Sequence, residues 1–285
     1  MSLVDRDPRS TALPAPEEVL AQAPDENFTV AGLIVGARRQ AQLRAIYGFA
    51  RLVDDVGDEA TGDRGALLDE VEAELGRIYA GQRPTHPLMA TLAISIRECS
   101  LPEDPFRRLV KANRQDQVVS RYETFDELLA YCQLSAAPVG ELVLHVFERA
   151  TPDRVALSDR VCAGLQVTEH LQDIEEDLGR GRVYIPRQDL AGCGCDPEDP
   201  PSSPPAARRA LVALESGRAR ALLDAGPPLL RSLPPRPRIA VAGFVAGGRA
   251  ALSELERQDG VAGSARARRR TPAFARTFLR TVAGR

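Results

Sequence analysis

The chain has 285 residues, 37 basic and 40 acidic side chains, and a formal net charge of −3. So small a net charge creates no overall positive field, and we expect no nucleic-acid partner. Lys111 is the sole lysine and no glycine-rich loop precedes it, which excludes Schiff-base chemistry and a P-loop.

Residues 1–24 come first in chain order, and they contain four prolines and no apolar run. We expect a flexible N-terminal segment here rather than a signal peptide. The two longest apolar stretches, 30–37 and 239–248, are shorter than the roughly 18 residues that a membrane span needs. The odd number of cysteines, five, is typical of reduced thiols, so the sequence indicates a cytoplasmic protein.

Apolar residues that recur every three and four positions predict helices along most of the remaining chain. The predicted helices cover 41–56, 66–79, 106–119, 125–147, 156–178, 206–225 and 239–258. Asp104 before Pro105 and Thr151 before Pro152 are typical helix starts, because the first residue can cap the helix and proline is tolerated in the first turn.

Residues 192–205 interrupt this helical pattern with five prolines and too little apolar content to pack, which predicts a surface loop. Cys193 and Cys195 in this loop have no second cysteine pair with which to form a metal site. The helices before and after the loop share one amphipathic pattern. We therefore expect a single all-α domain over 25–280.

One predicted helix carries a polar stripe that is separate from its apolar one. The polar members are Tyr47, Arg51, Asp54 and Asp58, and the apolar members are Ile46, Phe49, Val53 and Val56. Steps of four, three and four residues place the polar side chains within an arc of about 60° on one helix face. In a helical bundle such a stripe must face either water or an internal cavity.

A second predicted helix repeats the arrangement. Gln166, Asp173 and Asp177 share a face, with Glu169 at its edge, so each of the two helices offers a carboxylate pair one turn apart. Mg²⁺ prefers oxygen ligands, retains several waters and is commonly held by a few carboxylates together with substrate phosphates. The two pairs therefore favour a site for a polyphosphate bridged by Mg²⁺, which would take up the charge of a departing diphosphate.

Each stripe by itself is more often a solvated helix face. Their repetition with equal spacing favours the metal site, and Arg51 and Arg182 would add donors matched to phosphate. The three histidines, His86, His145 and His170, lack the spacing of a zinc or di-iron site. For His170, beside the second stripe, we expect a structural role.

At these residues the sequence resembles the squalene and phytoene synthase family. Asp54–Asp58 resembles the first aspartate-rich motif of that family, Gln166–Asp177 the second, and Gly181–Pro186 the Arg-x-Tyr-x-Pro segment that follows. Further similar positions are Gln115, Asp116, Arg121, Tyr122, Tyr131, Cys132 and Pro138–Gly140. The resemblance implies an isoprenoid-synthase-type helical bundle around a central cavity.

The resemblance also implies roles for individual residues. It assigns Tyr47, Asp54, Asp58, Asp173 and Asp177 to catalysis, Arg51, Asp116, Tyr131, Gln166, Arg182 and Tyr184 to substrate binding, and Asp54, Asp58, Glu169, Asp173 and Asp177 to Mg²⁺. The implied partner is an isoprenoid diphosphate. Aromatic faces such as those of Tyr47 or Phe49 would stabilise a carbocation in an apolar tunnel.

Within the family, four short segments are most similar to the bacterial branch of hopanoid synthesis. They are Glu26–Phe28, Phe49–Arg51, Arg114–Asp116 and Gln172–Asp173. This branch implies conversion of presqualene diphosphate and water to hydroxysqualene and diphosphate without NADPH, and other enzymes of that pathway are candidate partners. The alternatives are the condensation of two prenyl diphosphates, as in the sister branches, and a catalytically silent member that acts in binding or assembly.

Two positions depart from the family pattern. Glu169 stands where the second motif usually has Asn, which leaves the number and the affinity of metal ions open. Gln172 stands where condensing members often carry Arg, so that a donor to a diphosphate is lost. This loss favours a branch that handles only one diphosphate.

A basic cluster lies near the C-terminus and consists of Arg266, Arg268, Arg269 and Arg270. A solvated tail is the simpler interpretation. Contact with anionic lipid, at roughly 1 kcal/mol per basic residue, is the functional alternative, and a water-insoluble substrate would make it useful. The sequence thus predicts a cytoplasmic enzyme and leaves open peripheral contact with the inner face of the membrane.

Overall fold

A computed structural model describes residues 13–16, 19 and 36–257. In this part of the chain the regular elements are helices, and one isolated β-bridge pairs Arg121 with Val183, which confirms the all-α prediction. None of these helices combines the length and the apolarity needed to cross a membrane. The segment 26–28 and the basic cluster at 266–270 lie outside the described residues.

The chain divides into two compact units, 1–118 with 145–148 and 119–144 with 149–285. The first unit contains α3 (Ala37–Asp58), α4 (Arg64–Tyr79), α5 (Pro87–Cys99) and α6 (Asp104–Asp116). The second contains α7 (Phe125–Ser135), most of α8 (Ala137–Val146), α9 (Pro152–Gln172), α10 (Ile174–Gly179), α11 (Arg187–Cys193), the 3₁₀ turn η2 (Pro200–Ser202), α12 (Pro205–Leu223), α13 (Gly226–Ser232) and α14 (Pro235–Arg257). The single domain over 25–280 stays a prediction.

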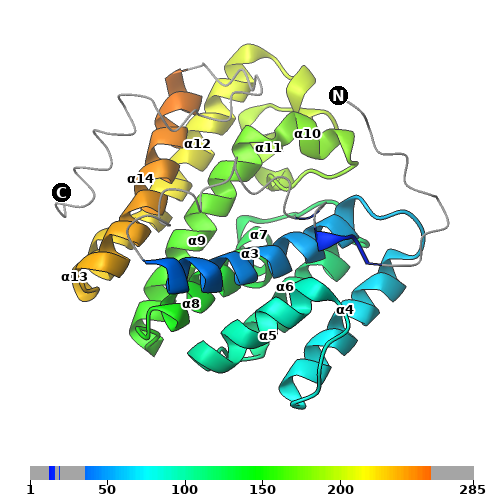
Figure 1. Cartoon of the computed structure of the whole chain (residues 1–285). Helices are drawn as coiled ribbons and strands as arrows, with labels where there is room; N and C mark the ends of the chain where they lie inside the picture. The colour runs from blue at the N-terminus through cyan, green and yellow to red at the C-terminus, as the bar shows by residue number, and fades with distance from the viewer. Residues whose placement is uncertain (1–12, 17–18, 20–35, 258–285) are drawn as a thin grey trace. The chain divides into compact units, whose positions relative to one another are not determined.

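In the first unit, α3 packs against α4, α5 and α6 (Figure 1). The buried apolar face of α3 includes Ile46, Phe49, Leu52, Val53 and Val56. Phe49 meets Phe106 of α6 edge to face, with the ring centroids 5.1 Å apart. Because removal of this apolar face from water drives the packing, Asp54 and Asp58 are left on an accessible side of α3.

In the second unit, α9 packs against α7, α12, α13 and α14 (Figure 1). Glycines permit the close approach of these helices. A Cβ atom on Gly164 would lie 3.0 Å from the carbonyl oxygen of Ala219, and one on Gly248 would lie 2.6 Å from Cδ2 of Leu165. The packing therefore holds α9, which carries Gln166 and Glu169 of the second polar stripe, tightly against α12 and α14.

Two predicted helices are interrupted in the structure. The helix predicted over 125–147 breaks just before Pro138, because proline lacks an amide hydrogen and is tolerated only in a first turn. The helix predicted over 156–178 begins earlier, at Pro152, and breaks at Asp173, whose φ of −106° and ψ of 15° are not helical.

Short helices also lie where the sequence pattern indicates none. Pro227 and Pro228, which separate two predicted helices, occupy the first turn of α13, where a missing amide hydrogen costs little. Of the longer elements, α5 is not among the predicted helices, although its apolar residues Leu88, Met89 and Leu92 are buried.

The loop predicted over 192–205 is more ordered than its composition indicates. Its first two residues complete α11, and Pro200 begins the 3₁₀ turn η2. The amide of Asp196 donates to Oγ of Ser203 at 2.8 Å, and both Pro200 and Ser203 are buried. These contacts give some backbone polar groups of the segment a partner, and its assignment as a surface loop stays a prediction.

Candidate active site

The first carboxylate cluster lies in the C-terminal part of α3, where Asp54 and Asp58 are one helical turn apart. Asn113 of α6 donates from Nδ2 to Oδ1 of Asp54 at 3.1 Å. Gly57 makes this contact possible, because a Cβ atom at that position would lie 2.1 Å from Oδ1 of Asn113. Gln117 donates from Nε2 to the carbonyl oxygen of Gly57 at 3.0 Å. Side chains at the end of α6 therefore support the aspartate pair.

The carboxylate of Asp54 is the most strongly perturbed group of this cluster. Solvent reaches the residue, but protein atoms crowd the carboxylate and reduce its hydration. This desolvation raises the pKa of Asp54 to about 7, and the charges of Asp58 and Asp55 add to the rise. The hydrogen bond from Asn113 and the charge of Arg51 oppose it. A divalent cation would favour the ionised form of such a carboxylate.

Arg51, predicted to bind substrate, forms ion pairs beside this cluster. Its Nη2 lies 2.7 Å from Oδ1 of Asp55 and 3.1 Å from Oε1 of Glu59. The guanidinium thus neutralises the buried Asp55 while its charge also acts on the neighbouring aspartate pair. Tyr47, one turn before Arg51, is buried, and Asp116 is half-buried at the end of α6.

The second carboxylate cluster lies at the junction of α9 and α10. Asp173 separates the two helices, yet the amide of Asp177 donates to the carbonyl oxygen of Asp173 at 2.8 Å, so the two residues stay one helical turn apart. Glu169 and Asp173 are exposed and Asp177 is half-buried. The amide of Arg182 donates to the carbonyl oxygen of Asp177 at 2.9 Å, which anchors the chain after α10. This junction offers carboxylate oxygens to a ligand.

An aromatic cluster adjoins the second aspartate pair. Tyr184 stacks on His170, with ring centroids 3.9 Å apart and the planes inclined by 16°. Its ring also lies 5.4 Å from that of Tyr131 and 5.9 Å from that of Tyr122. The segment after α10 therefore returns over the end of α9 and places aromatic faces beside the carboxylates.

His170 joins this aromatic cluster to the polar stripe. Its Nδ1 lies 3.7 Å from Oδ2 of Asp177, and its Nε2 lies 3.4 Å from Nε2 of Gln166. Arg182, another predicted substrate-binding residue, is buried in the segment that leads from α10 to Tyr184.

The predicted site residues therefore fall into two groups. The first unit holds Tyr47, Arg51, Asp54, Asp58 and Asp116, and the second holds Tyr131, Gln166, Glu169, Asp173, Asp177, Arg182 and Tyr184. In the first unit, Asp54 and Asp58 lie on one face of α3, as the sequence predicts. In the second unit, Asp173 and Asp177 lie one helical turn apart at the junction of α9 and α10. That the two groups meet across one cavity stays a prediction.

Sequence reasoning missed Asn113 and assigned His170 only a structural role. A signal for Asn113 exists, because it is a polar residue at a buried position of the amphipathic helix α6. His170 is four residues after Gln166, a spacing at which two side chains on a helix are neighbours. Neither signal predicts the distant contacts, which are Asn113 with Asp54 and His170 with Tyr184.

The donor set of the two clusters fits Mg²⁺. Among the described residues, no three His, Cys, Asp or Glu side chains lie close enough to hold a metal by themselves. Each cluster offers a carboxylate pair instead, and Mg²⁺ commonly combines one or two carboxylates with waters and substrate phosphates. The raised pKa of Asp54 agrees with this fit, because a nearby cation would relieve the cost of its charge.

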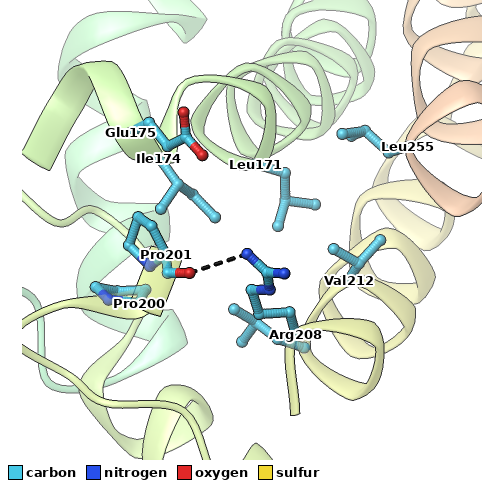
Figure 2. A pocket seen from close by; sticks show the side chains of 9 residues that line it. Leu171, Ile174, Glu175, Pro200, Pro201, Arg208, Val212 and Leu255 are labelled. Atoms are coloured by element: carbon cyan, nitrogen blue, oxygen red, sulfur yellow. Dashed lines mark hydrogen bonds between the residues drawn. The ribbon is translucent and has the colours of Figure 1, made fainter. Parts of the chain in front are cut away.

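Figure 2 shows a mainly apolar pocket in the second unit. It is lined by Leu171, Ile174, Glu175, Pro200, Pro201, Arg208, Leu211, Val212 and Leu255. Arg208 donates from Nη1 to the carbonyl oxygen of Pro201 at 2.9 Å (Figure 2). Asp173 and Asp177 do not line this pocket, so we do not assign it to the candidate active site.

The all-α fold is that of the isoprenoid-synthase-type proteins among the solved structures, and the aspartate pair at i and i+4 in each of the two units agrees with the motifs that the sequence resemblance implies. The chain belongs to the squalene/phytoene synthase family, whose model matches residues 21–274. Members of this family process prenyl diphosphates.

Individual relatives agree with this assignment. The chain is 38% identical over 211 residues to a hydroxysqualene synthase of Rhodopseudomonas palustris, a match that covers 72% of this chain and 70% of the relative. It is 31% identical to phytoene synthase 1 of Arabidopsis thaliana, over 67% of this chain and 50% of that protein. The structure of squalene synthase HpnC from Alicyclobacillus acidocaldarius is 41% identical, with a TM-score of 0.77 and coverage of 86% of this chain and 92% of that one.

Proposed function

We propose that the protein catalyses the Mg²⁺-dependent conversion of presqualene diphosphate and water to hydroxysqualene and diphosphate. The observation that carries this proposal is the state of Asp54. The residue is exposed and lies one helical turn before Asp58, and desolvation raises the pKa of its carboxyl to about 7. A nearby cation would stabilise the ionised form of this carboxyl, and the Mg²⁺ that accompanies a bound diphosphate would be such a cation.

In the proposed reaction, the carbon–oxygen bond to the diphosphate breaks, the resulting cation rearranges with opening of the cyclopropane ring, and water forms a new carbon–oxygen bond and loses a proton. When bound, Mg²⁺ takes up the negative charge of the departing diphosphate. Its ligands would come from Asp54, Asp58, Glu169, Asp173 and Asp177. The rings of Tyr47 and Tyr131 are buried in their units, and an aromatic face that borders the substrate would stabilise a cation.

Gln172 supports the choice of branch. It is half-buried next to Asp173, and its neutral amide cannot form the charge-assisted bonds that an arginine would make with a second diphosphate. The likeness to the hydroxysqualene synthase of Rhodopseudomonas palustris points to the same reaction. Both observations favour a reaction that consumes a single diphosphate ester.

Product analysis tests the proposal directly. Purified protein with presqualene diphosphate and Mg²⁺ is expected to release diphosphate and a triterpene alcohol, identified by mass spectrometry. Asp54→Asn removes one charge with little change of shape and should reduce the rate by about 100-fold or more. Undiminished activity of this variant would contradict the proposal. Consumption of farnesyl diphosphate offered alone would instead identify a condensing synthase.

A binding measurement distinguishes an enzyme from a catalytically silent member. Mg²⁺ with inorganic diphosphate should raise the melting temperature of the protein, because a ligand that binds only the folded state stabilises it. Glu176→Gln is a matched control, since Glu176 is an exposed carboxylate of α10 that pairs with Arg180. The control should retain the full shift, whereas the absence of a shift in the wild type would favour the silent member.

A further inference from the structure

His170 is a polar side chain to which the proposed chemistry gives no task. Only 6% of the residue is exposed, although it lies in the last turn of α9, directly before the exposed Asp173. Its two ring nitrogens face two different members of the second polar stripe, Gln166 and Asp177. A histidine needed only to fill space would not require a polar neighbour on each side.

The two neighbours favour the same imidazole tautomer. The amide of Gln166 presents its nitrogen to His170, and because an amide nitrogen can only donate, Nε2 of His170 accepts in this contact. The ionised carboxylate of Asp177 can only accept, and at 3.7 Å its negative charge favours a hydrogen on the Nδ1 atom of His170 that faces it. Both contacts therefore favour the ring with its hydrogen on Nδ1.

Aromatic packing fixes the orientation of this ring. Tyr184 covers one face of the imidazole at 3.9 Å, and the ring of Tyr131 lies 6.3 Å away. Tyr131 and Tyr184 also pack on each other, so the ring of His170 has neighbours that are themselves held in place. A rotation by 180° would direct ring carbons at Gln166 and Asp177 and lose both polar contacts.

We propose that His170 is a positioning residue that directs the Asp177 carboxylate toward the metal-bound diphosphate, and that Tyr184 and Gln166 hold the imidazole in the tautomer needed for this. The inference rests on the proposed function, because it concerns the same carboxylate cluster. A partner that orients a ligating carboxylate typically accounts for 10- to 100-fold in metal affinity. Tyr184, in the segment that follows α10, thus helps to position Asp177 because it holds the ring of His170.

Three substitutions separate positioning from packing. His170→Asn keeps an amide donor at the place of Nδ1, His170→Gln moves the amide to the place of Nε2, and His170→Phe keeps an aromatic ring without either nitrogen. The probe is Mg²⁺ titrated in the presence of inorganic diphosphate, with the melting temperature as the signal. His145→Phe, the same change on α8, is the matched control.

We expect the Phe and Gln variants to need about 10- to 100-fold more Mg²⁺ for half of the full shift. The Asn variant and the His145→Phe control should stay within about threefold of the wild type. Equal loss in the Asn and Gln variants would overturn the inference, as would wild-type behaviour of His170→Phe. If His170→Phe does not fold, the comparison of Asn with Gln still decides the question.

A spectroscopic test needs neither metal nor activity. In the metal-free wild-type protein, at a pH where the imidazole is neutral, the ¹⁵N chemical shifts of His170 should identify Nδ1 as the protonated nitrogen. Protonation at Nε2 would overturn the inference. If the wild type fails to bind Mg²⁺ and diphosphate at all, the proposed function fails, whereas the tautomer is still tested by this spectrum.

Discussion

Asn113 supports the first carboxylate cluster through one side-chain amide. Its Nδ2 donates to Asp54, and its Oδ1 packs against Gly57, where a larger residue would collide with it. The hydrogen bond stabilises the ionised form of Asp54 and so opposes the desolvation that raises the pKa of that carboxyl. Asn113 therefore keeps part of the Asp54 population ionised near neutral pH.

Asn113→Ala should weaken Mg²⁺ binding mainly at low pH. Without the donated hydrogen bond the pKa of Asp54 rises further above its ordinary value, so a larger fraction of the carboxyl is protonated as the pH falls through about 7. We expect the Mg²⁺ requirement with inorganic diphosphate to rise about tenfold at about pH 6.5 and clearly less at about pH 8.5. Melting temperatures at the two pH values measure this.

The exposed Gln133→Ala on α7 is the control for this experiment, and it should leave the Mg²⁺ requirement unchanged at both pH values. An equal effect of Asn113→Ala at both pH values would show that Asn113 does not act through the protonation of Asp54.

At the scale of elements, the approach of α9 to α12 depends on Gly164. A Cβ atom there would lie 3.0 Å from the carbonyl oxygen of Ala219 and 3.0 Å from Cγ of Leu223. The backbone oxygen cannot move away as a flexible side chain could. Gly217, on α12 itself, has open space where a Cβ atom would be placed.

The two glycines should respond to alanine with opposite signs. Gly164→Ala is expected to lower the free energy of unfolding by about 1–2 kcal/mol, because overpacking outweighs the gain in helix propensity. Gly217→Ala should raise it by up to about 1 kcal/mol, since propensity alone acts there. Urea unfolding of both variants measures this, and stabilisation by both substitutions would refute the close approach of α9 to α12.

Two of the predicted helices are broken, one between α7 and α8 and one between α9 and α10. Apolar spacing runs without interruption through Pro138 and Asp173, so it predicts two long helices where the structure has four. The break before Pro138 follows from a local rule about proline, which the apolar pattern does not contain. The break at Asp173 has no such signal in the sequence, and it is visible only in the backbone angles of that residue.

At the scale of the whole molecule, the proposed function requires that both aspartate pairs bind one ligand. Asp54→Asn and Asp173→Asn should each weaken the binding of inorganic diphosphate with Mg²⁺ by about 10- to 100-fold. If both act on the same metal-bound diphosphate, the double variant should be far less impaired than the product of the two effects, because residues that act as a unit are not additive. Isothermal titration calorimetry measures the four affinities.

As a control, the same double-mutant comparison is made with Asp54→Asn and Glu176→Gln. It should show no coupling, because Glu176 belongs to neither predicted ligand set. If the losses of affinity caused by Asp54→Asn and Asp173→Asn simply multiply in the double variant, the two aspartate pairs bind independently. That result would contradict a single site.

Much of the candidate site was predictable because it depends on local periodicity. The positions of Asp54 and Asp58 on α3 follow from the four-residue step and from the apolar residues between them. The step from Asp173 to Asp177 survives the helix break, because the amide of Asp177 still bonds to the carbonyl oxygen one turn back. The role of Asn113 was not predictable, since its partner Asp54 lies on another helix. For His170 the helical spacing specifies the neighbour Gln166 but not Tyr184, which covers the ring.

The sequence by itself determined that this protein is helical, that it carries two aspartate pairs at one-turn spacing and that it belongs to the squalene/phytoene synthase family, because spacing and motif are properties of short segments. Only the tertiary structure decided how the carboxylates are supported. Asn113 reaches Asp54 across 59 positions of the chain, and Tyr184 returns to cover His170. Such contacts depend on how distant helices pack, and no local pattern of residues encodes which side chains will meet.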